Sequence, residues 1–112
     1  KFTEYYYTKF DTARQELHAL YRGTSLLTWE DKQIVGVKGI LEHLTNLPFQ
    51  KVAHRITSLD AQPSSGGLLV LVTGQLLIDD NVNPLQFSQV FHLIPEGTSF
   101  YVQNDLFKLN YG

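Results

Sequence analysis

Apolar side chains recur at intervals of three and four residues in the first half of the chain, which is the spacing of an amphipathic helix. Two such runs lie near the N-terminus: Phe2, Tyr6 and Phe10, then Leu17, Leu20 and Tyr21. We expect two short helices here, hinged near Asp11, whose side chain is a good N-cap for the second. A third run follows Gly36 and comprises Val37, Ile40, Leu41, Leu44 and Leu47. Because Pro48 cannot continue a helix, the third helix should end at about Leu47.

The pattern between and after these helices is that of strands. Residues 27–30 and 33–35 predict two short strands around a turn at Asp31 and Lys32. Four longer runs, rich in β-branched and aromatic residues, occupy positions 49–60, 68–79, 85–94 and 100–109. Turn-forming residues separate the four runs, so consecutive strands should pair antiparallel as a meander. The segregation of helices and strands predicts a single α+β domain over residues 1–112.

Both faces of the predicted sheet are apolar. In the third long run, Phe87, Phe91 and Leu93 lie on one face and Val90 and Ile94 on the other; in the fourth, Phe100, Val102 and Leu106 oppose Tyr101, Phe107 and Leu109. Three helices can cover only one face of so long a sheet. The other face should therefore be buried against a second subunit, most simply in a twofold dimer that includes Leu106 and Leu71. A sheet curled tightly enough to cover itself is the alternative.

The composition is that of a folded domain with no general affinity for nucleic acid or anionic lipid. Of the 112 residues, 43% are hydrophobic and 18% charged, and the net charge is −2. The chain has no cysteine, which excludes disulfides, thiolate metal sites and thiol nucleophiles and fits a reducing compartment. The longest apolar run, Leu68 to Val72, is far shorter than the ~20 residues of a membrane helix.

Acidic residues are unevenly placed. Positions 56–107 contain no Lys or Arg but include Asp60, Asp79, Asp80, Glu96 and Asp105. If several of these share a face, they create a negative field that attracts a positively charged partner. The alternative is that they are scattered residues of loops and turns.

Common catalytic motifs are absent, and the four histidines are isolated. His54 and His92 lie on predicted strands, and no third residue has a spacing that would complete a metal site with them. We expect them in a core or cavity wall, with no metal and no cofactor. Trp29 stands beside Glu30, which suits an apolar anchor bordered by negative charge, although a half-buried aromatic beside a solvated acid is the simpler interpretation. The pair of acids at 79–80 could repeat this arrangement at a strand end.

Six blocks, in order along nearly the whole chain, resemble the nuclear transport factor 2 family. They are Leu-Thr-Trp-Glu at 27–30, Leu-Pro-Phe-Gln-Lys-Val at 47–52, the block from His54 to Pro63, Gly-Gln-Leu at 74–76, Phe-Ser-Gln-Val-Phe at 87–91 and Asn-Asp-Leu-Phe at 104–107. The resemblance implies a bent antiparallel sheet wrapped by helices into a cone with an open apolar cavity. It also implies a homodimer that forms through the other face of the sheet.

The function that this resemblance implies is that of a carrier and not of an enzyme. Such a carrier binds the GDP form of the small GTPase Ran and enters the nucleus through weak contacts with phenylalanine-glycine nucleoporins, so it is found in the cytoplasm, the nucleus and the nuclear pore. An aromatic side chain of Ran enters the cavity and basic residues beside it pair with acids on the rim. The matching positions are Trp29, Glu30, His54, Asp79 and Phe107 for Ran and Pro84 for nucleoporins.

The chain departs from the family pattern at Asn81, where many relatives have an acid. One ion pair at the rim therefore has no assigned acid, and Asp80 is the available substitute. Two other functions remain. Isomerases and dehydratases also use this fold, and here Asp105, His54 and His92 would be the candidate bases and Tyr21 or Tyr101 the donors. An unpaired inner carboxylate with a raised pKa would favour catalysis, whereas acids confined to the rim would favour binding. Relatives that scaffold RNA-export or stress-granule complexes are the third class.

Overall fold

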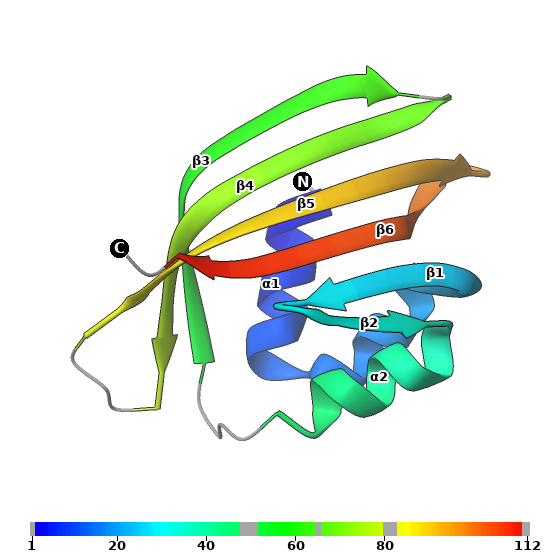
Figure 1. Cartoon of the computed structure of the whole chain (residues 1–112). Coiled ribbons are helices and arrows are strands. Elements are labelled where there is room, and N and C mark those ends of the chain that lie inside the picture. The colour runs from blue at the N-terminus through cyan, green and yellow to red at the C-terminus, as the bar shows by residue number, and fades with distance from the viewer. Residues whose placement is uncertain (1, 48–51, 65, 80–82, 111–112) are drawn as a thin grey trace.

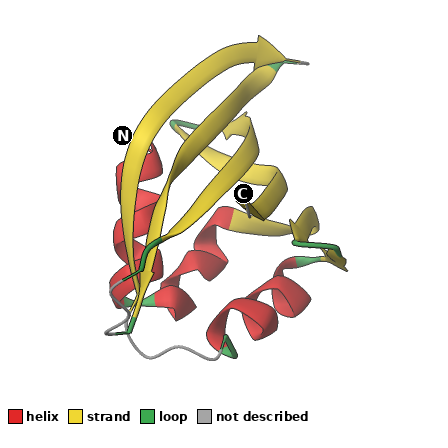
Figure 2. Cartoon of the chain, turned by 60° about the vertical axis from the view of Figure 1, so that its left-hand side comes forward, coloured by secondary structure: helices red, strands yellow, loops and turns green. Residues whose placement is uncertain are grey.

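A six-stranded sheet bends over three helices in the computed structural model, which describes residues 2–47, 52–64, 66–79 and 83–110 (Figure 1). The elements in chain order are α1 (Phe2–Thr12), the 3₁₀ helix η1 (Arg14–Leu20), β1 (Tyr21–Trp29), β2 (Lys32–Val35), α2 (Val37–Thr45), β3 (Val52–Ser64), β4 (Gly67–Ile78), β5 (Leu85–Glu96) and β6 (Ser99–Asn110). The three helices lie on one side of the sheet (Figure 2), which confirms the predicted α+β class. Within the described ranges, no helix is long and apolar enough to cross a membrane.

The sheet has the strand order β2-β1-β6-β5-β4-β3. Its four long strands are consecutive antiparallel neighbours, so the predicted meander is confirmed. The sequence did not reveal that β1 joins β6 in parallel, with Trp29 opposite Phe107. It also placed the start of this strand at Leu27, whereas β1 already begins at Tyr21. Pairing with a strand about 80 residues away leaves no local signature, and this explains both omissions.

The prediction of the second helix is wrong in the type of helix and in its N-cap. Residues 14–20 form a tight 3₁₀ helix with no side-chain cap at Ala13, and Tyr21 already belongs to β1. Asp11 lies in the last turn of α1, and its carboxylate binds His54 instead of a helix N-terminus. The third helix is confirmed: it follows Gly36, which has a φ of +90°, and ends at Thr45, two residues before the predicted end. Pro48 lies outside the described residues.

The core lies between the helices and the inner face of the sheet. In β5, Phe87, Phe91 and Leu93 are buried, as their alternation predicts. In β6 the prediction that Val102 and Leu106 share a face is wrong. The pairing with β5 skips Gln103, so this bulge reverses the alternation, and Val102 enters the core while Leu106 points outward.

The outer face of the sheet has an apolar row at its centre. Leu71 of β4 pairs with Val90 of β5, which pairs with Leu106 of β6. The two leucines are 42% and 49% exposed. The row ends at Asp60 on one side and Thr28 on the other. The sheet is bent but open, with β2 and β3 at its edges, so the alternative of a sheet curled over itself is wrong.

Gly74 permits the close approach of β3 and β4, and its replacement by alanine should destabilise the fold. A Cβ at this position would lie 2.3 Å from the carbonyl oxygen of Arg55, a backbone atom beside the β3 bulge. We expect Gly74→Ala to lower the free energy of unfolding by about 3 kcal/mol, measured by urea denaturation. Gly23→Ala is the control, because a Cβ there meets nothing within 4 Å. Equal unfolding midpoints for the two variants would contradict this account.

Candidate functional site

Five aromatic rings from five elements meet at one end of the sheet. They are Phe10 of α1, Trp29 of β1, Phe107 of β6, Phe87 of β5 and His54 of β3, and we call them the aromatic circle. In that order, the centroids of neighbouring rings lie 6.3, 4.1, 5.6 and 5.4 Å apart, and His54 closes the circle with Phe10 at 5.0 Å. The circle joins the helical layer to four strands of the sheet at the place where the sequence predicted a partner site.

Trp29 is the partly exposed member of the aromatic circle. Its indole lies parallel to the Phe107 ring, with an interplanar angle of 5°, and Phe107 is only 2% exposed. The ring of His43, from α2, meets the indole at 5.3 Å. Burial and the nearby charge of Lys32 lower the pKa of His43, so this imidazole is neutral at pH 7. The accessible part of the circle is therefore an apolar tryptophan edged by a neutral ring.

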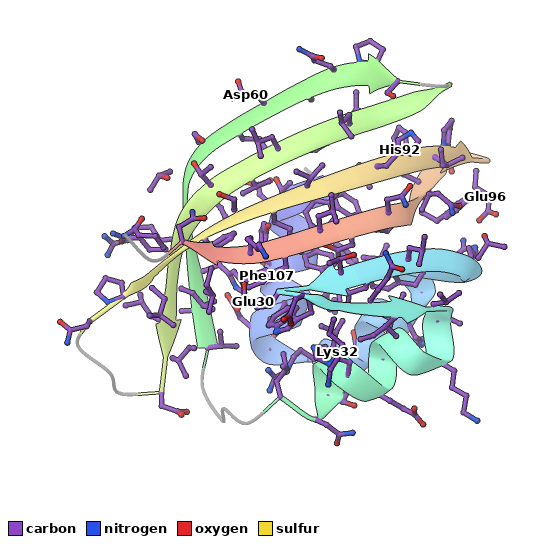
Figure 3. All side chains as sticks on the ribbon, in the orientation of Figure 1. Glu30, Lys32, Asp60, His92, Glu96 and Phe107 are labelled. Atoms are coloured by element: carbon purple, nitrogen blue, oxygen red, sulfur yellow. The ribbon has the colours of Figure 1, made fainter. Side chains whose placement is uncertain are left out.

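Glu30 begins the turn between β1 and β2 in the left-handed region, with a φ of +61°. Its backbone N–H donates to the carbonyl oxygen of Phe107, and its Oε1 accepts the N–H of Leu109 at 2.6 Å. The carboxylate thus extends the parallel ladder by one hydrogen bond beyond the end of β1. Figure 3 shows Glu30 beside Phe107 at this end of β1. The structure therefore holds a negative charge in a defined position next to Trp29.

His54 is held by Asp11 of α1. The carboxylate of Asp11 accepts the backbone N–H of His54 at 3.1 Å and lies 2.6 Å from its Nδ1. The imidazole is only 2% exposed. Together with Tyr7 and Ile56, these two residues line a groove of about 600 Å³ between α1 and β3. Asp11 was not predicted as a site residue; no sequence signal pairs it with a histidine 43 positions away.

The remaining predicted site residues lie at the loop between β4 and β5. Asp79 is exposed at the end of β4 with a φ of +53°, and Pro84 is exposed just before β5. The end of β4 and the start of β5 are at the same end of the sheet as the end of β1 (Figure 1). Asp80 and Asn81 lie outside the described residues. The substitution of Asp80 for the acid that is absent at position 81 therefore stays a prediction from the sequence.

The acids of positions 56–107 do not share a face in the described part of the chain. Asp60 lies on β3 at the end of the outer apolar row, far from Glu30 (Figure 3). Glu96 pairs with Arg22, and Asp105 is 1% exposed in the core. The alternative of scattered acids is therefore right for these three. The negative charge that the structure places beside Trp29 is that of Glu30.

Asp105 is the centre of a buried hydrogen-bond network. Its Oδ2 accepts the hydroxyl of Tyr21 at 2.7 Å and that of Tyr6 at 3.3 Å, and its Oδ1 accepts the side-chain amide of Gln89 at 2.7 Å. Tyr7 donates to the amide oxygen of Gln89 at 2.7 Å. Burial raises the pKa of Asp105 to about 6, although all three hydrogen bonds favour the charged form. We call these five residues the Asp105 network.

The Asp105 network does not form a catalytic constellation. The pKa of Asp105 is raised, as an inner catalytic carboxylate would require, but both of its oxygens are occupied by donors and it is 1% exposed. His92 lies on the outer side of the sheet, where its Nε2 is 3.1 Å from the carbonyl oxygen of Ser64, and Tyr101 lies under Arg22. The proposed bases and donors thus do not converge on one cavity. Among the described residues no group of three side chains could hold a metal ion.

Acidification should stabilise the fold through Asp105. The carboxyl of the unfolded chain titrates near pH 4, whereas the folded pKa is about 6. Between these values the folded state holds a proton that the unfolded state has lost, so this contribution is complete below about pH 4 and is lost as the pH rises through 6. A shift of this size corresponds to roughly 3 kcal/mol. Denaturant unfolding of the wild type and of Asp105→Asn from about pH 4 to 7 measures this contribution. As the pH falls, the free energy of unfolding of the wild type should rise relative to that of Asp105→Asn. If the two free energies change in parallel with pH, the raised pKa of Asp105 is contradicted.

Comparison with known proteins agrees with this architecture. The model of the nuclear transport factor 2 domain matches residues 1–109. Nuclear transport factor 2 of Candida glabrata is 62% identical over 113 aligned residues, which cover 99% of this chain and 90% of the relative. The structure of nuclear transport factor 2 from Cryptosporidium parvum superposes with a TM-score of 0.93 at 48% identity, covering 97% of this chain and 89% of that one.

The fold is also shared with proteins of other function. A putative scytalone dehydratase from Novosphingobium aromaticivorans superposes with a TM-score of 0.80, covering 97% of this chain and 79% of that one, but only 12% of the residues are identical. That similarity shows the fold alone. The close relatives are named as transport factors, and the similarity to them runs through the whole chain. The chain therefore belongs to the nuclear transport factor 2 family and is a nuclear transport carrier rather than an enzyme.

Proposed function

We propose that this nuclear transport carrier takes Ran-GDP as its cargo and binds it at the aromatic circle. The residues that contact the cargo are Trp29, Glu30, His54, Asp79 and Phe107, with Asp80 as a further loop acid. The observation that supports the proposal most strongly is the pairing of a partly exposed tryptophan with a carboxylate held in place by Leu109. An apolar anchor with a fixed negative charge beside it suits a partner that presents an aromatic ring next to Lys or Arg.

The two kinds of contact contribute differently. A ring buried in an apolar pocket contributes ~2 kcal/mol or more, whereas an ion pair at the exposed rim contributes ~1 kcal/mol or less and chiefly sets orientation and association rate. Trp29 lies flat on Phe107, which is 2% exposed, so the indole covers the phenylalanine where the resemblance implied an open cavity, and an incoming ring meets Trp29 first. The affinity should consequently be moderate and should fall with added salt.

The same proposal includes a homodimer through the outer face of the sheet. Leu71 and Leu106 of the apolar row are exposed in the single chain. Two hollows of about 240 and 280 Å³ on this face share Val90 in their walls, and a partner's side chains could fill them. The same row of a second subunit would cover this apolar row, because a twofold interface joins identical patches of the two subunits.

Transport requires weak contacts with the pore as well. We place Pro84 at the edge of a groove for phenylalanine-glycine nucleoporins, which would let the carrier pass between cytoplasm and nucleus through the nuclear pore. Small apolar contacts break quickly, and this suits a protein that must release both the pore and its cargo.

A binding assay with the two nucleotide states of Ran tests the proposed cargo. Immobilised carrier should retain GDP-loaded Ran and should leave GTP-loaded Ran in solution. Equal retention of both forms, or retention of neither, would contradict the proposal. The control is the same assay at high salt, in which the retained amount of GDP-loaded Ran should fall.

A further inference from the structure

We infer that Tyr7 and Gln89 are positioning residues for cargo binding, because they hold the imidazole of His54 in place from the buried side of the molecule. This inference rests on the proposed binding of Ran-GDP at the aromatic circle. Both residues are largely buried: Tyr7 is 5% exposed, at the wall of the groove between α1 and β3, and Gln89 is 2% exposed. Neither residue is among the proposed cargo contacts, so both would act through His54.

The orientation of Gln89 is determined by its two partners. The hydroxyl of Tyr7 donates to Oε1 of Gln89 at 2.7 Å, and Nε2 of Gln89 donates to Oδ1 of Asp105 at 2.7 Å. Burial and the charge of Asp105 raise the pKa of Tyr7, so its hydroxyl keeps its proton and remains a donor. A flipped amide would turn its NH₂ group toward Tyr7 and its oxygen toward a carboxylate. The chain Asp105–Gln89–Tyr7 thus has one favourable direction.

The hydrogen bond from the Tyr7 hydroxyl to Gln89 fixes the position of the Tyr7 ring. Its centroid is 4.5 Å from that of His54, with an interplanar angle of 35°, and 6.1 Å from that of Phe87. Asp11 meets His54 from its Nδ1 edge at 2.6 Å. One neighbour therefore restrains the face of the imidazole and the other restrains its edge. With both in place, His54 has a single position in the aromatic circle between Phe10 and Phe87.

Removing the Tyr7 hydroxyl is the sharpest test, since Tyr7→Phe leaves the ring and deletes one hydrogen bond. We expect Tyr7→Phe to weaken Ran-GDP binding by about 2- to 10-fold in calorimetry, the range for one buried neutral hydrogen bond. In the free protein, the ring proton signals of His54 in NMR spectra should shift. Tyr6→Phe is the matched control: Tyr6 is 1% exposed and also donates to Asp105, but its ring packs on Phe91 and Tyr7. It should leave the His54 signals in place.

A double-mutant cycle with His54→Gln separates positioning from general destabilisation. If Tyr7 acts through His54, Tyr7→Phe should cost little affinity once His54 is replaced. Additive losses would overturn the inference, and so would unchanged His54 signals in Tyr7→Phe. Gln89→Met, which keeps the length of the side chain but lacks its hydrogen bonds, should shift the same signals and serves if Tyr7→Phe folds poorly.

The NMR measurement distinguishes a failure of this inference from a failure of the proposed Ran-GDP binding. If the wild type fails to bind Ran-GDP, the proposed function is wrong and the binding consequence is lost with it. Shifted His54 signals would still support the positioning of the imidazole in that case, whereas unchanged signals would overturn it independently of any cargo.

Discussion

A glutamate in place of Leu106 is expected to leave the chain folded and to make it monomeric in analytical ultracentrifugation. Leu106 is 49% exposed in the single chain and points away from the core, so the charge remains solvated when the subunit is alone. In the proposed dimer the same carboxylate would be buried in the apolar row beside Val90. Burying an unpaired charge costs several kcal/mol, which is enough to raise the dissociation constant of a dimer by a factor of roughly 100 or more.

Phe100→Glu is the control for this experiment. Phe100 is also an exposed apolar residue of β6, at 39%, but it lines a different groove, with Tyr5 of α1. The substitution should leave the dimer intact. A Leu106→Glu variant that still sediments as a dimer at micromolar concentration would show that the outer apolar row is not the interface.

Glu30→Lys is expected to abolish detectable binding of Ran-GDP in calorimetry while the dimer persists. The substitution places a positive charge at an acidic position whose carboxylate is held by a hydrogen bond next to Trp29. Like charges brought together across an interface cost several kcal/mol, more than the loss of one rim ion pair. Unchanged affinity would show that the cargo binds at another face of the molecule.

Glu30 also has a structural task, which the controls must separate from its charge. Lysine cannot accept the N–H of Leu109, so Glu30→Lys also leaves that donor to solvent. Glu30→Gln keeps an acceptor oxygen and removes only the charge. We expect it to retain the unfolding midpoint of the wild type and to bind Ran-GDP about 2- to 5-fold more weakly, since an exposed ion pair contributes ~1 kcal/mol or less. Wild-type affinity in Glu30→Gln together with a low unfolding midpoint in Glu30→Lys would reduce Glu30 to a structural residue.

Local patterns in the sequence were sufficient for most elements of the fold. Phe87, Phe91 and Leu93 alternate with smaller or polar residues, and β5 follows that alternation because it has no bulge. In β6 a single extra residue, Gln103, moved Val102 into the core and left Leu106 outside. Bulges depend on how two strands pair, so the prediction failed at the point where pairing overrides alternation.

The candidate site shows the same division. The side-by-side placement of Trp29 and Glu30 in the sequence indicated an anchor with a charge, and both residues do lie at one end of the sheet, with Trp29 on Phe107. The partners that hold the site in place were missed. The sequence predicted Asp11 as a helix cap and predicted no role for Tyr7 or Gln89. Asp11 contacts His54, 43 positions away, and Tyr7 contacts Gln89, 82 positions away, so no local pattern indicates either contact.

The order of apolar and turn-forming residues thus determined, without any coordinates, that this chain is an α+β domain with more apolar sheet surface than its own helices can cover. Periodicity and turn chemistry are properties of neighbouring residues, and hydrophobic burial acts on them wherever the chain folds. The parallel joining of β1 to β6, the closed aromatic circle and the Asp105 network were decided only by tertiary structure. Hydrogen bonds and ring contacts between distant segments depend on positions within a few ångströms, and no spacing along the chain encodes those positions.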